Sequence, residues 1–175
     1  MDRRNVILAL TGAAAAPILL GTVARGQTAT DMLDPASYTA DTLQIGTLAK
    51  TVSQIALQNS KSPVVLRFAK LEIDEQTAVA QSLTNDADPP PAALTDQQQM
   101  MVQSLQGLSG AAFDIAYIKG QIQGHNQLAA IQSEFLASDT DITANPVHVA
   151  LIAAAFIETH LSVLHALLPI VLATG

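Results

Sequence analysis

Prolines and polar clusters divide this chain into long apolar stretches, and no other feature of the sequence constrains the fold as much. Breaks occur at residues 59–63, at residues 85–92, which include three consecutive prolines, and at residues 138–146. Between them, apolar residues recur at steps of three and four, which is the period of an amphipathic helix. Ala and Leu, which favour helix most, supply most of the apolar volume, and no segment shows the sustained alternation of a β-strand. The sequence therefore predicts an all-α protein.

The expected architecture is a four-helix bundle at residues 36–175, with one additional short helix after a Pro-rich crossover. The expected long helices span residues 36–59, 63–83, 110–137 and 146–172, and the short one spans 96–107. Only three residues separate the first two long helices, which makes them antiparallel neighbours. Ser62 and Pro63 suit the N-cap and the first turn of the second helix. The stiff crossover at 89–91 lets the third long helix take a direction that a tight turn would not permit.

The first 26 residues have the three-part pattern of an export signal. Arg3 and Arg4 precede an apolar stretch, and small residues lead to Gly26, where we expect cleavage. The arginine pair resembles a twin-arginine signal, although ordinary secretory signals carry such pairs as well. The alternative is an uncleaved anchor, since the apolar stretch approaches the length of a short membrane span. We expect a periplasmic or otherwise exported protein, with residues 27–35 forming a loop before the bundle.

Charge and motif content disfavour several classes of function. The chain has 15 Asp and Glu against 8 Lys and Arg, for a net charge of −7, so it lacks the basic surface of a nucleic-acid-binding protein. It contains no cysteine, which excludes disulfides and thiolate metal sites. It also has no nucleophile-elbow motif and no phosphate-binding glycine loop. The sequence therefore leaves enzymatic activity open without favouring it.

The helix expected at residues 146–172 is apolar on nearly every side. Such a helix lies at the centre of a protein, at an interface or in a membrane. Glu158, His160 and His165 in its middle argue against a span that faces lipid. We therefore expect a central position, with self-association through residues 161–172.

Polar residues on the last two helices form the candidate site. On the helix expected at 110–137, spacings of seven and four residues place Asp114, Gln121 and His125 on one polar line, with Tyr117 as a further hydrogen-bonding partner. On the last helix, Glu158 and His165 share a line and His160 lies beside it. No metal-ligand spacing occurs within one helix, which favours a buried hydrogen-bonded network without a cofactor. The alternative is a transition-metal site for Zn, Cu or Fe, with four candidate ligands: His125, Glu158, His160 and His165.

Two other carboxylate arrangements are disfavoured. A ferritin-type di-iron site needs Glu three residues before His on each of two helices, and none of the four histidines has Glu at that position. Glu72 and Glu75 lie one turn apart, as in an acid–base pair. Their charged or polar neighbours, Lys70, Asp74 and Gln76, favour a solvated face instead.

The segment at residues 108–127 resembles the family called domain of unknown function 4142, which comprises exported bacterial proteins labelled predicted outer-membrane proteins. The matches to the family's helix motif are Phe113, Asp114, Ala116, Tyr117, Gln121 and His125. The resemblance implies a ferritin-like bundle outside the cytoplasm and no known reaction. This chain departs from the family in the first helix, where family members carry glutamates and it has Ala49 and Thr51. The departure weakens the case for metal ligands at those positions. The same holds in the second helix, where the family's Asp-His reads Asp74-Glu75-Gln76.

Taken with the residues, this resemblance favours a non-enzymatic exported bundle that works by binding or assembly, for example in envelope stress. Its partner in the envelope is unidentified. A transition-metal-binding bundle that stores, carries or uses the ion is the alternative function, and an anchored envelope protein is the second alternative.

Overall fold

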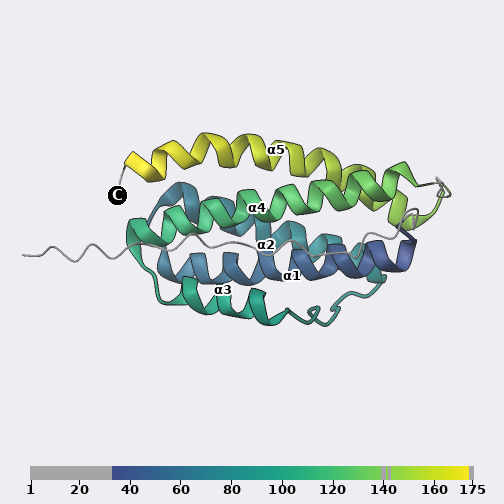
Figure 1. Cartoon of the computed structure of the whole chain (residues 1–175), viewed down its shortest axis with the longest axis horizontal. Coiled ribbons are helices and arrows are strands. Elements are labelled where there is room, and N and C mark those ends of the chain that lie inside the picture. The colour runs from purple at the N-terminus through teal and green to yellow at the C-terminus, as the bar shows by residue number, and fades with distance from the viewer. Residues whose placement is uncertain (1–32, 139–140, 142, 174–175) are drawn as a thin grey trace, which may run out of the picture.

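A computed structural model describes residues 33–138, 141 and 143–173, and within them the chain forms five α-helices and no strand (Figure 1). The helices are α1 (Pro35–Asn59), α2 (Pro63–Thr84), α3 (Asp96–Gln106), α4 (Gly110–Ala137) and α5 (Asn145–Ala173). The prediction of an all-α protein is confirmed, and each helix begins and ends within one residue of its expected bounds. The expected export signal at residues 1–26 and loop residues 27–32 lie outside the described part.

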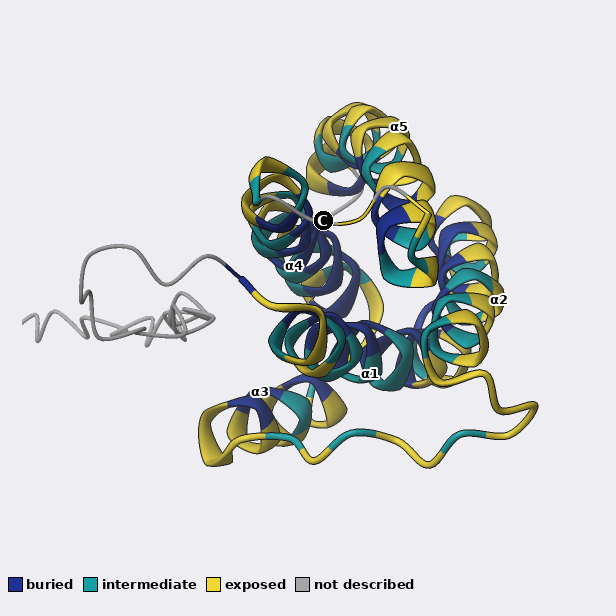
Figure 2. Ribbon diagram, turned by 90° about the vertical axis from the view of Figure 1, so that its right-hand side faces the viewer, coloured by how far each residue is buried: buried dark blue, intermediate teal, exposed yellow. Residues whose placement is uncertain are grey.

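Helices α1, α2, α4 and α5 form a four-helix bundle, and α3 packs against the outside of α1 (Figures 1 and 2). Around the bundle the order is α1, α2, α5, α4, so α2 and α4 are diagonal. These two helices run parallel, because Phe68 is near Tyr117 and Glu72 is near His125. The Pro-rich crossover produces this arrangement by carrying the chain back along the bundle. A single long crossover is the connection that ferritin-like bundles use.

Local sequence signals account for the helix ends. The Asp34 carboxylate accepts hydrogen bonds from the main-chain N–H groups of Ala36 and Ser37, at 2.8 and 3.0 Å, and so caps α1. A capping box between Thr95 and Gln98 starts α3. Ser62 occupies the expected N-cap of α2, but its side chain makes no capping hydrogen bond.

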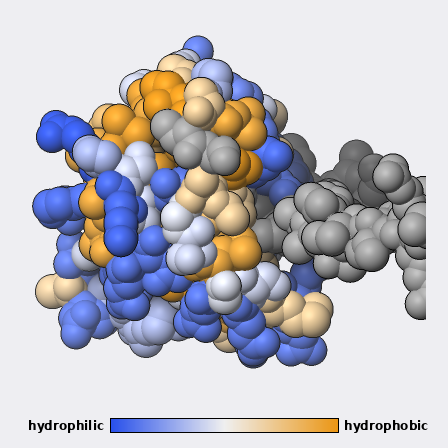
Figure 3. Space-filling view, turned by 90° about the vertical axis from the view of Figure 1, so that its left-hand side faces the viewer, coloured by the Kyte–Doolittle hydropathy of each residue, from blue (hydrophilic) through white to orange (hydrophobic). Residues whose placement is uncertain are grey.

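The position of α5 differs from the one that the sequence predicted. One face of α5 packs against α4 and α2, and its buried residues are Val147, Ala150, Ala153, Ile157, Leu164 and Val171. The opposite face is uncovered along its length, and the large apolar residues exposed there are Leu151, Ile152, Phe156, Val163, Ile170 and Leu172 (Figure 2). Seen from the end where α5 terminates, apolar atoms gather at the top of the molecule, over α5 (Figure 3). The helix is therefore peripheral in the single chain and not central.

The length and composition of α5 alone would allow it to cross a membrane, and among the described residues it is the one helix of that kind. His160, however, points into the protein and contacts residues of α2 and α4. The inner face of α5 is therefore committed to the bundle.

Candidate metal centre

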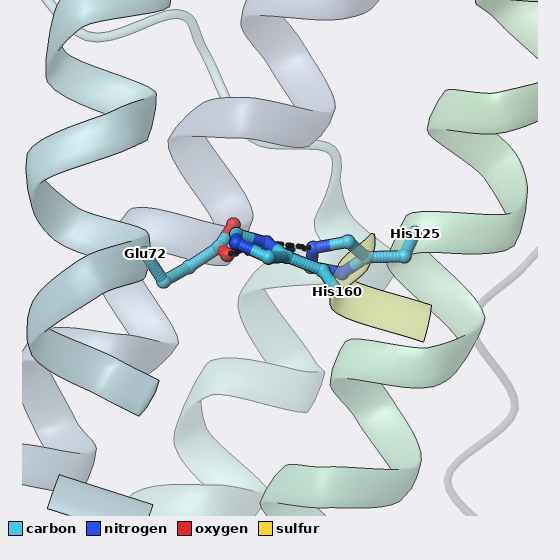
Figure 4. A group of neighbouring side chains, drawn as sticks. All are labelled: Glu72, His125 and His160. Carbon is cyan, nitrogen blue, oxygen red and sulfur yellow. Dashed lines mark hydrogen bonds and ion pairs between the residues drawn. The ribbon is translucent and has the colours of Figure 1, made fainter. Parts of the chain in front are cut away.

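Three ionisable side chains from three helices meet in the core of the bundle. Glu72 comes from α2, His125 from α4 and His160 from α5, and they point toward one another (Figure 4). Glu72 Oε2 lies 3.4 Å from His125 Nε2 and 3.3 Å from His160 Nδ1. The two imidazole nitrogens are 3.1 Å apart. The side chains of Glu72, His125 and His160 are 0, 1 and 13% exposed, so the three atoms meet almost entirely away from solvent.

The inward position of Glu72 follows from the apolar stripe of α2. The buried residues of α2 repeat at steps of three and four: the apolar Val65, Phe68 and Ala69 are followed on the same face by Glu72 and Gln76. The prediction of a solvated Glu72–Glu75 face is therefore wrong for Glu72. Its charged neighbours Lys70 and Asp74 lie at the surface, where they pair with each other at 2.9 Å.

The partners of the two imidazoles indicate where their protons lie. His125 Nδ1 is 2.8 Å from the main-chain carbonyl oxygen of Gln121. A carbonyl only accepts, so Nδ1 carries the hydrogen and Nε2 of the neutral ring presents a lone pair. On the other ring, His160 Nε2 lies 3.2 Å from Glu75 Oε2. That carboxylate favours a proton on Nε2, which leaves a lone pair on Nδ1.

With neutral imidazoles, the centre of the site is thus lined by three electron-pair donors. Glu72 Oε2 is buried and has no hydrogen-bond donor within the described part of the chain. Burial alone would raise the pKa of Glu72, but when the imidazoles carry an added proton, their hydrogen bonds to Glu72 and their positive charge outweigh burial and hold this pKa at about 2. Glu72 in turn raises the pKa of His160, although burial opposes the effect. The site therefore attracts positive charge, supplied either by a proton on an imidazole or by a metal ion.

The triangle of donor atoms has the size that a small divalent ion requires. Zn²⁺ binds imidazole nitrogen and carboxylate oxygen at about 2.0–2.2 Å, and tetrahedral geometry then places two ligand atoms roughly 3.3–3.6 Å apart. The observed separations of 3.1, 3.3 and 3.4 Å lie close to this range. A metal could therefore be held with little movement of the ligands.

Each of the three candidate ligands is also held by a second group. Gln76 Nε2 donates to Glu72 Oε1 at 3.0 Å, Gln121 holds His125, and Glu75 holds His160. Such outer partners fix ring orientation and increase the basicity of metal ligands. Gln76 in turn depends on Gly46 of α1, because a Cβ atom at position 46 would collide with Gln76 Oε1.

The sequence is similar to one known protein family. The model of one family, described as a domain of unknown function, DUF4142, matches residues 22–146. The chain belongs to the DUF4142 family. In this DUF4142 chain the match includes Glu72 and His125 and ends at the start of α5, so His160 lies beyond it. No curated protein and no solved structure matches the chain.

The predicted site residues of this DUF4142 chain divide into two groups. His125 and His160 meet at the centre, whereas Glu158 and His165 are exposed on the outer face of α5 and take no part. Glu72 and Glu75 were missed, although the apolar stripe of α2 contains the signal that would have found Glu72.

The predicted polar network of the DUF4142 chain lies beside the centre. Tyr117 and Gln121 both contact Ser53 Oγ of α1, at 2.8 and 3.0 Å, and burial raises the pKa of Tyr117. This network joins His125 through the main chain of Gln121. Asp114 is also buried, but within the described residues its Oδ1 has no hydrogen-bond partner.

Proposed function

We propose that this DUF4142 protein is a transition-metal-binding helical bundle in which Glu72, His125 and His160 are the ligands. The observation that carries the proposal is the meeting of three buried donor atoms within 3.4 Å of one another. Two imidazole nitrogens and one carboxylate oxygen suit Zn²⁺ and Fe²⁺. The chain has no cysteine, so it offers no thiolate for a softer ion such as Cu⁺.

The proposed role is ion binding. Three protein ligands leave a fourth position for a water molecule or another small ligand. Glu72 and His125 are almost completely buried, which leaves no room beside them for a larger substrate without a change in packing. Phe68 adds an apolar wall, with its ring centre 6.0 Å from that of His125 and 5.3 Å from that of His160.

The competing function of the same residues is structural. In that case a proton on His160 takes the place of the metal, and the Glu72–His160 ion pair fixes the packing of α5 on α2. The raised pKa of His160 suits this role as well. The two functions differ in whether the purified protein retains metal.

Metal analysis and ligand variants test the proposal. Protein purified from cells that express the full chain is analysed for metal and then titrated with Co²⁺, whose visible absorption reports tetrahedral coordination. We expect about one ion per chain, with binding lost in Glu72→Gln, His125→Gln and His160→Gln. Glu158→Gln and His165→Gln are the matched controls, because both residues are exposed on α5, and both should bind as the wild type does. Binding that is absent from the wild type, or retained in all three ligand variants, would refute the metal site.

We also propose that the protein works outside the cytoplasm. The support is the pattern of residues 1–26, with its arginine pair, apolar stretch and small residues near Gly26. Mass spectrometry of the protein from a periplasmic extract should show a chain that begins between residues 24 and 31. An intact Met1 on protein recovered from the cytoplasm would contradict export. A role in envelope stress or assembly would require the same export.

A further inference from the structure

The uncovered face of α5 is organised in three parallel rows. The middle row consists of small residues, all exposed: Ala155, Thr159, Ser162 and Ala166. One flanking row repeats every seven residues and contains Leu151, Glu158, His165 and Leu172; the other contains Phe156, Val163 and Ile170. A spacing of seven residues corresponds to two helical turns, so each row runs nearly straight along α5.

The row that contains Glu158 is complementary to a second copy of the same row that runs in the opposite direction. It has Leu at each end and one acidic and one imidazole side chain between them. If a second α5 lay antiparallel, with a twofold axis passing between Leu161 and Ser162, each Leu151 would face Leu172 of the second copy. Each Glu158 would then face His165 of the second copy, twice by symmetry. A parallel pair would instead place each Glu158 beside the other flanking row of the second copy, close to Val163, where it has no complementary charge.

We propose that α5 forms an antiparallel dimer interface with α5 of a second copy of this chain. The small middle row lets the two helix axes approach closely, and the large residues on either side close around it. The two hydroxyls in that row already donate to main-chain carbonyl groups of α5, Thr159 to Ala155 at 3.0 Å and Ser162 to Glu158 at 3.1 Å. Burial of the row therefore leaves no donor without an acceptor.

A second copy suits this face better than lipid does. Glu158 and His165 lie in the middle of the face, where a bilayer would have to accommodate both without partners at considerable cost. In the dimer each of them has a complementary partner, while Phe156, Ile152 and Leu172, which are 49, 58 and 50% exposed, lose contact with water. The inference is independent of the proposed metal site, because His160, the ligand that α5 supplies, faces the core and not the uncovered face.

Engineered cysteines test the pairing, since the chain has none of its own. Ser162→Cys lies beside the proposed axis, so the two copies of the thiol should form a disulfide under mild oxidation. Ala155→Cys is the matched control, a small exposed residue of the same row. At 1.5 Å per residue its two copies would be roughly 20 Å apart and could not join. Cross-linking at both positions would indicate a parallel pair and overturn the proposal, as would cross-linking at neither.

Charge exchange provides a second test, with sedimentation equilibrium of protein purified from cells expressing the full chain. The wild type should be dimeric. His165→Glu should weaken the dimer several-fold, because it places like charges opposite each other twice. Adding Glu158→Lys should restore the dimer by creating opposite charges across the axis. A monomeric wild type, including one that instead binds lipid vesicles, would overturn the proposal, and so would a failure of the second substitution to restore dimerisation.

Discussion

Gly46→Ala is predicted to destabilise the protein, although this substitution usually stabilises a helix. Gly46 lies inside α1, where Ala is favoured over Gly by about 0.8–1.0 kcal/mol. The added Cβ atom would displace the side-chain amide of Gln76, which donates to Glu72 Oε1 at 3.0 Å. The outcome depends on which of these two effects is larger.

The loss of that hydrogen bond is expected to be the larger effect. Removing the donor from a buried carboxylate oxygen costs about 1–3 kcal/mol. After the gain in helix propensity is subtracted, the net destabilisation is about 0–2 kcal/mol. Gly120→Ala is the control: it lies inside α4, and a Cβ atom there would have no neighbour within 4 Å. That substitution should stabilise the protein by about 1 kcal/mol.

Urea unfolding of both variants and of the wild type measures the two free energies on one scale. If metal is bound, the Gly46 variant should also lose affinity by about 10–100-fold, because Gln76 supports a ligand, while the Gly120 variant should bind normally. Stabilisation of both variants by equal amounts would refute the reasoning. It would mean that Gln76 and Glu72 adjust without cost, and the site would then not be rigidly preorganised.

Three further outcomes are expected. Leu164→Ala should cost about 2–5 kcal/mol in urea unfolding, because Leu164 is fully buried, whereas Leu57→Ala at a side chain that is 46% exposed should have a much smaller effect. Tyr38→Phe should cost about 1–3 kcal/mol, because it removes a hydrogen bond of 2.7 Å to a buried glutamine. In metal-free protein, the lowered pKa of Glu72 stabilises the folded state at pH values above its usual pKa of 4.5. This stabilisation is lost as the pH falls toward 2. The raised pKa of His160 stabilises the folded state below its usual pKa of 6.5, and this stabilisation is lost as the pH rises through the raised value. His160→Gln should therefore lower the free energy of unfolding more at about pH 5.5 than at about pH 8.

Most of the architecture could be predicted because it depends on local signals. Pro63 is the first residue of α2, and Pro146 lies in the first turn of α5. Three consecutive prolines, as at residues 89–91, prevent helix formation whatever packs around them. The position of α5 could not be predicted in this way. Hydrophobicity on all sides of a helix shows that every face avoids water, but not whether the same chain or another molecule covers each face.

Only part of the candidate site could be predicted, because it depends on which helix faces meet. His125 lies on the inward face of α4, and steps of three and four along that helix reveal it. Glu72 was misplaced because its neighbours in sequence are charged, whereas burial follows neighbours one turn away, such as Phe68 and Gln76. Glu158 and His160 are only two residues apart, but this separation turns them to different sides of α5, one exposed and one facing the core.

The burial of the ligands has a consequence for the rate at which metal would exchange. Glu72 and His125 are 0 and 1% exposed, and His160, the most accessible of the three, belongs to α5, which packs on the bundle by one face only. An ion could therefore leave only when α5 moves away from α2 and α4, a local opening of the kind that hydrogen exchange detects. The rate of release should then be independent of the concentration of a competing chelator once the chelator is in excess. Residence time would therefore depend on the docking of α5, which supplies one of the three ligands, as well as on the bonds to the ion.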